Sequence, residues 1–141
     1  MSSTITASGN CLCGAVTVEA ASMSTDIASC HCNICRKWGG GPLMAVDCAT
    51  EVTIKGQDSI KVFATSDWAE RGFCAKCGTH LFFRLKESGQ YIIPVGLFDQ
   101  QAPLHFGLQI FVDEKPDYYA FGNPTSNLTG AEFFAQLTDQ D

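Results

Sequence analysis

Hydrophobic and polar residues alternate in several short runs along the chain. In the run from Ala15 to Glu19, for example, the valines stand at every second position, and the run follows Gly14. A period of two is typical of β-strands that bury one face. Turn residues such as Gly56-Gln57-Asp58 separate these runs. The pattern predicts strands at Ala15–Glu19, Leu43–Cys48, Glu51–Lys55, Ile60–Phe63, Arg71–Phe73, His80–Leu85, Tyr91–Leu97 and Leu108–Val112.

Two features add detail to this pattern. The strands on either side of Cys74-Ala75-Lys76-Cys77-Gly78 predict a hairpin whose tip carries both cysteines, with Gly78 suited to a left-handed backbone. Near the end of the chain, Thr129 and Glu132 have the spacing of a helix capping box. The apolar residues that follow, Phe133, Phe134 and Leu137, recur at helical spacing. We therefore expect a mainly β fold of several small antiparallel sheets with a short C-terminal helix.

Composition narrows the class of protein. The chain has 141 residues, is 45 % hydrophobic and shows no internal repeat or linker, which predicts a single domain spanning residues 1–141. No apolar run approaches the ~20 residues that cross a bilayer, so no membrane association is expected. The net charge of −6 argues against a nucleic-acid partner, because such a surface needs clustered Lys and Arg. The sequence gives no indication of the oligomeric state.

Seven of the eight cysteines lie in three tight clusters: Cys11-Leu12-Cys13, Cys30-His31-Cys32-Asn33-Ile34-Cys35 and Cys74-Ala75-Lys76-Cys77. Cysteines two or three positions apart on a turn can direct their sulfurs at one metal ion, as thiolates do around tetrahedral zinc. The eighth, Cys48, lies in a mostly apolar run and is expected to fill the core as a small hydrophobic residue.

Three other interpretations of the clusters are weaker. A disulfide framework is typical of secreted proteins, whereas Met1–Asn10 has neither the basic start nor the apolar run of a signal peptide. A redox Cys-x-x-Cys site is expected to stand alone, but each such pair here has further cysteines nearby. Two closed structural zinc sites remain possible if His31 or His80 supplies an eighth ligand. The need for reduced thiolates favours a cytoplasmic location.

The seven ligands divide into four and three. Cys11, Cys13, Cys74 and Cys77 make a closed, structural zinc site that ties the start of the chain to its middle. Cys30, Cys32 and Cys35 then converge on one local turn, and any other division would split this trio. Three protein ligands and one open position are the pattern of a catalytic zinc. The expected cofactor is therefore Zn²⁺, with two ions per chain.

The three motifs resemble those of a known family. The residues that carry the resemblance are Gly9-Asn10-Cys11-Leu12-Cys13-Gly14-Ala15-Val16, Cys30-His31-Cys32-Asn33-Ile34-Cys35-Arg36-Lys37 and Arg71-Gly72-Phe73-Cys74-Ala75-Lys76-Cys77-Gly78-Thr79. In this order they are similar to the glutathione-dependent formaldehyde-activating enzyme family, which also includes centromere protein V. The resemblance covers about residues 9–122 and implies a tent-like, zinc-binding β fold. It also implies a carbon–sulfur lyase that forms or cleaves S-hydroxymethylglutathione, with a small-molecule thiol such as glutathione as partner.

This activity makes demands on the three-cysteine site. A thiol bound to zinc loses its proton readily, so we expect the metal to carry the thiol rather than activate the carbonyl. Glutathione has two carboxylates, and Arg36 and Lys37, directly after Cys35, are the candidate substrate-binding residues. Arg71 and Arg84 are weaker candidates, and no general acid or base is assigned. The alternative function is a non-catalytic interaction module with two structural zinc ions.

Overall fold

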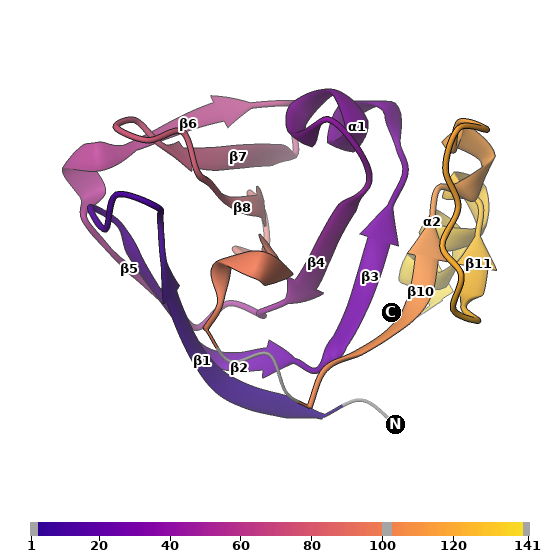
Figure 1. The fold of residues 1–141 in the computed structure, drawn as a ribbon, viewed down its shortest axis with the longest axis horizontal. Coiled ribbons are helices and arrows are strands. Elements are labelled where there is room, and N and C mark those ends of the chain that lie inside the picture. The colour runs from indigo at the N-terminus through magenta and orange to yellow at the C-terminus, as the bar shows by residue number, and fades with distance from the viewer. Residues whose placement is uncertain (1–2, 100–102, 140–141) are drawn as a thin grey trace.

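The computed structural model describes residues 3–99 and 103–139 of the chain, and most of its regular elements are strands (Figure 1). A small antiparallel sheet has the strand order β1-β2-β5. Its strands are β1 (Thr4–Asn10), β2 (Thr17–Ser24) and β5 (Val52–Lys55). In Figure 1, β1 and β2 run along the lower edge of the molecule and β5 continues this layer.

A larger sheet has the order β11-β10-β3-β4-β9-β8-β7-β6. Its strands are β3 (Asp26–Cys30), β4 (Leu43–Asp47), β6 (Ile60–Ala64), β7 (Ala69–Cys74), β8 (His80–Leu85), β9 (Tyr91–Pro94), β10 (His105–Ile110) and β11 (Ser126–Leu128). Most neighbours are antiparallel, whereas β10 runs parallel to both β3 and β11. The expected mainly β fold with several sheets is confirmed.

The helices are short. In the described part of the chain, α1 (Asn33–Gly39) follows β3, and α2 (Gly130–Asp139) lies near the C-terminus beside β10 and β11 (Figure 1). The 3-10 turns are Gln57–Ser59, Val95–Leu97 and Val112–Glu114. Neither α-helix is long and apolar enough to span a membrane.

The capping box at the start of α2 is confirmed. The Glu132 amide donates to the Thr129 hydroxyl at 3.1 Å, and the Thr129 amide donates to the Glu132 carboxylate at 2.8 Å. Two N–H groups that the first helical turn leaves unpaired are thereby satisfied.

The main core lies between the two sheets. Ala7, Val18 and Met23 of the small sheet pack in one cluster with residues of the larger sheet, among them Val46 and Leu81. Val18, Val46 and Leu81 lie in runs that the sequence pattern predicted as strands. The segments that contain Ala7 and Met23 were not predicted as strands. Cys48 belongs to the same fully buried cluster, as expected, and burial raises the pKa of its thiol to about 12.

Candidate functional site

Two turns bring the first group of cysteines together. Cys11 and Cys13 follow β1, and Cys74 and Cys77 lie at the tip of the β7–β8 hairpin. In each turn the glycine directly after the second cysteine has a φ of 80°, and its amide donates to the carbonyl of the first cysteine: Gly14 to Cys11 at 3.0 Å and Gly78 to Cys74 at 2.8 Å. Both turns are thus closed by a glycine amide, although the second is one residue longer.

The sulfurs of this four-cysteine centre have the spacing of a tetrahedral metal site. The Cys11 and Cys13 Sγ atoms are 3.6 Å apart, those of Cys13 and Cys74 are 3.7 Å apart, and all four lie within 4.8 Å of one another. Zinc–sulfur bonds of about 2.3 Å in a tetrahedron place neighbouring sulfurs about 3.8 Å apart. The donor set therefore fits zinc, and the predicted grouping of these four residues is found.

The second group is built on the start of α1. Cys30 ends β3, Cys32 is the N-cap of α1 and Cys35 lies in its first turn, with the Cys35 amide donating to the Cys32 sulfur at 3.3 Å. The three Sγ atoms lie within 4.8 Å of one another. Their mutual hydrogen bonds lower the pKa of Cys32 and raise that of Cys30, as expected when thiols share protons at close range.

This three-cysteine centre also fits a metal, with three protein ligands. Among the described residues, the ligand atoms of other His, Cys, Asp or Glu side chains do not join the group. The structure therefore places the seven cysteines in one group of four and one group of three, as the sequence predicted. A tetrahedral ion at the trio would have one position left for a ligand from outside the chain.

His31, between two of the ligands, points to other partners. Its ring is fully buried, with Nε2 2.8 Å from the Gln109 amide oxygen and Nδ1 2.7 Å from the Tyr119 hydroxyl. Because the Gln109 oxygen can only accept, Nε2 carries the proton and the Tyr119 hydroxyl donates to Nδ1. Both ring nitrogens thus have partners outside the cysteine group, which argues against His31 as an additional metal ligand. Burial lowers the pKa of His31.

The two predicted substrate-binding residues differ in their surroundings. Arg36 is half-buried, and its Nε donates to the His31 carbonyl at 2.9 Å. Lys37 is exposed on α1. Lys115, which the sequence reasoning did not select, places its ammonium 4.9 Å from the centre of the Tyr119 ring. Arg36 and Lys115 are therefore the cations around the Tyr119–His31 pair.

Arg71, a cation of β7, contacts the trio directly. The Arg71 guanidinium is 4 % exposed, and its Nη2 lies 3.3 Å from the Cys35 sulfur. It contacts two rings, with its central carbon 4.7 Å from the centre of Trp38 and 5.1 Å from that of Phe83. Trp38 also stacks on His80, with ring centres 3.9 Å apart. Trp38 therefore links α1 to β7 and β8 beside the three-cysteine centre.

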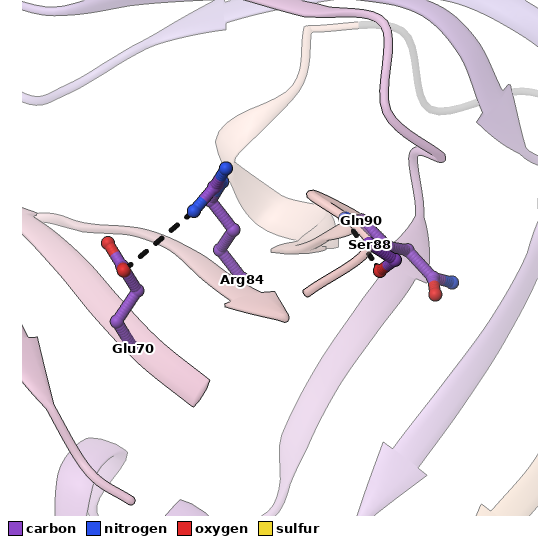
Figure 2. A network of polar contacts seen from close by, with 4 residues as sticks. All are labelled: Glu70, Arg84, Ser88 and Gln90. Carbon is purple, nitrogen blue, oxygen red and sulfur yellow. Dashed lines mark hydrogen bonds and ion pairs between the residues drawn. The ribbon is translucent and has the colours of Figure 1, made fainter. Parts of the chain in front are cut away.

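Arg84, the other weaker candidate, is engaged elsewhere. It pairs with Glu70 across the β7–β8 ladder, and its Nη1 lies 3.8 Å from the Glu70 carboxylate (Figure 2). The next pair along this ladder joins Arg71 to Phe83. Since successive strand residues face opposite sides of a sheet, Arg71 and Arg84 serve different surfaces.

Comparison with known proteins agrees with this geometry. The family model for the glutathione-dependent formaldehyde-activating enzyme matches residues 6–114, a range that contains all seven clustered cysteines. The chain belongs to this family. A curated relative named as an uncharacterised lyase of Schizosaccharomyces pombe is 37 % identical over 130 residues, which are 92 % of this chain and 95 % of the relative.

A solved structure shares the fold of this chain. It is a Rhodobacter sphaeroides protein with a TM-score of 0.58 and 22 % identity, and the match covers 68 % of this chain and 91 % of the other. The family resemblance predicted from the three cysteine motifs is confirmed.

Proposed function

We propose that this protein is a zinc-dependent carbon–sulfur lyase that forms or cleaves S-hydroxymethylglutathione or a related thiol adduct. The observation that carries the proposal is the group of three cysteines, which would leave one position of a tetrahedral metal for a substrate, whereas the other group supplies four sulfurs. Membership of the formaldehyde-activating family and the lyase name of the S. pombe relative support the same reaction class.

The residues of the two centres would have different tasks. Cys11, Cys13, Cys74 and Cys77 would hold a structural zinc, and Cys30, Cys32 and Cys35 a zinc that supplies a place for a substrate thiolate. In the forward reaction a sulfur–carbon bond forms between the thiol and formaldehyde, and the thiol proton ends on the former carbonyl oxygen. The reverse reaction returns that proton to the sulfur as the bond breaks.

The chain's own side chains would position the thiol. The Arg36 guanidinium, fixed through Nε by the His31 carbonyl, still has its terminal N–H groups for a glutathione carboxylate. Lys37, exposed one residue later on α1, offers a second cation to the other carboxylate. His31 holds the turn between Cys30 and Cys32 through Gln109 and Tyr119.

Exchange spectroscopy tests the proposal. Glutathione and ¹³C-formaldehyde equilibrate with their adduct, and the zinc-loaded protein should accelerate this interconversion above the uncatalysed rate. Cys32→Ser should abolish the acceleration, whereas Cys48→Ala, which removes a buried cysteine outside both centres, should retain it. A rate equal to the uncatalysed one with wild-type protein would reject the lyase and favour a non-catalytic module.

The same assay addresses the substrate. Changing Arg36 and Lys37 together to Ala should weaken the apparent affinity for glutathione more than that for mercaptoethanol, which has no carboxylate. An equal loss for both thiols would show that these residues do not recognise glutathione.

A further inference from the structure

Arg71 is a cation in an environment that makes a lone charge costly. It lies in the middle of β7 and is 4 % exposed. Burying a charge is unfavourable unless an opposite charge or a full set of hydrogen bonds compensates it. Its Nε and Nη1 atoms have no hydrogen-bond partner among the described residues, so hydrogen bonds within the protein do not provide this compensation.

Carboxylates do not provide it either. The ion pairs of the described residues join Lys55 to Glu19 and Arg84 to Glu70, and neither includes Arg71. Its one hydrogen bond to a group that can carry negative charge is the contact of Nη2 with the Cys35 sulfur at 3.3 Å. The anion that balances Arg71 must therefore be the three-cysteine centre.

We propose that Arg71 is the fixed counter-ion of the three-cysteine centre and that it favours an anionic over a neutral fourth ligand there. The inference rests on the metal occupancy assumed in the proposed function. Three thiolates around a divalent zinc leave a net charge of −1, which the guanidinium neutralises. A thiolate that enters as the fourth ligand then brings the net charge of the centre and Arg71 to −1, whereas without Arg71 it would be −2.

The surroundings of Arg71 keep its charge in place. The flat guanidinium contacts the Trp38 and Phe83 rings at 4.7 and 5.1 Å, distances at which an aromatic face attracts a cation. Phe83 is also the cross-strand partner of Arg71. A lysine ammonium at this position would keep the charge but lose the planar stacking.

Ligand binding to the cobalt-substituted protein tests the proposal. Mercaptoethanol, which binds as a thiolate, and imidazole, which binds as a neutral molecule, are titrated while the cobalt absorption bands report the fourth ligand. Arg71→Met should weaken thiolate binding about 10- to 100-fold, because one compensating charge near the fourth ligand is lost in an effective dielectric of about 20. Imidazole binding should change less than about threefold.

Two variants serve as controls. Arg71→Lys should retain the preference for the thiolate, since it keeps the charge. Arg84→Met removes the neighbouring arginine, which pairs with Glu70, and should leave both affinities unchanged. Equal weakening of both ligands in Arg71→Met would show a purely structural role, and unchanged thiolate binding would equally overturn the proposal.

Stability provides a test that does not need an open fourth position. Cys35→Ala removes the thiolate that Arg71 contacts and leaves a buried charge without a partner. The further substitution Arg71→Met removes that charge. The double variant should unfold at a urea concentration at least as high as that of Cys35→Ala alone. A double variant that is less stable would contradict the counter-ion role. If neither ligand enters the wild-type centre, the proposed lyase fails while this comparison still decides the role of Arg71.

Discussion

The two cysteine centres should contribute unequally to stability, and the structure gives the size of the difference. The four-cysteine centre links sulfurs that are far apart in the chain, since Cys13 and Cys74 are separated by 61 positions. A cross-link of this span restricts the unfolded chain by about 4 kcal/mol. Cys30 and Cys35 are five positions apart. The same relation gives about 2 kcal/mol for the three-cysteine centre.

Serine substitutions separate the two effects. Cys74→Ser should lower the free energy of unfolding by about 4 kcal/mol or more, because Cys74 is also fully buried in the core. Cys32→Ser should lower it by about 2 kcal/mol or less, since a serine oxygen can replace the sulfur as N-cap of α1. With domains of this size stable by about 5–15 kcal/mol, only Cys74→Ser should approach unfolding.

Urea denaturation of the zinc-loaded proteins, followed by circular dichroism, measures both values. With a slope of about 2 kcal/mol per molar urea, the midpoints should fall by about 2 M for Cys74→Ser and by about 1 M for Cys32→Ser. Removing metal from the wild type with a chelator should lower its urea midpoint at least as much as Cys74→Ser does. Equal losses in the two variants, or the larger loss in Cys32→Ser, would refute the division into a structural and a functional centre.

Two further substitutions test the fold around these centres. Gly9→Ala should destabilise the protein by about 1–3 kcal/mol, because its Cβ would clash with the Leu97 carbonyl oxygen. Gly96→Ala is the control, since its Cβ would meet open space, and it should change the urea midpoint little. Similar effects of the two substitutions would contradict the close approach of the backbone at Gly9. Thr129→Ala should cost about 1 kcal/mol by removing the hydroxyl that accepts from the Glu132 amide, seen as a lower melting temperature, and an unchanged melting temperature would show that the cap does not contribute.

The sequence predicted the parts of the fold that depend on local pattern. Examples are the strands with alternating apolar residues, the capping box at Thr129 and the tip of the β7–β8 hairpin. Each is determined by residues a few positions apart. The grouping of the seven cysteines was also predictable, since the trio spans one turn and leaves two pairs for the other centre. These predictions needed no knowledge of how distant strands pair.

Other elements have no local signal. Strand β1 contains Ala7, Ser8 and Gly9, small residues with little preference for strands, and it is held by β2 and by the bridge from Gly9 to Phe98. The parallel pairing of β10 with β3 joins segments about 80 positions apart, so no nearby pattern reveals it. Pairing of this kind depends on the whole topology rather than on a window of sequence.

The surroundings of the candidate site follow from such long-range pairing. Arg71 looked like one of several scattered cations, and its burial beside Cys35 results from its register opposite Phe83 and from the position of α1. The partners of His31 lie 78 and 88 positions away, in Gln109 and Tyr119. The sequence therefore predicted which cysteines lie together, and only the structure reveals the charges and hydrogen bonds that surround them.

The two cysteine centres have the same type of side chain but different surroundings. The four-cysteine centre lies on two glycine-containing turns and offers four sulfurs, with Cys13 exposed to solvent. The three-cysteine centre has one ligand fewer and more support. Its turn is anchored to β10 by the buried His31–Gln109 hydrogen bond, and Cys35 is held by Arg71 from β7. A centre that must exchange a ligand without losing its shape needs such anchors, because the metal alone then no longer fixes the geometry.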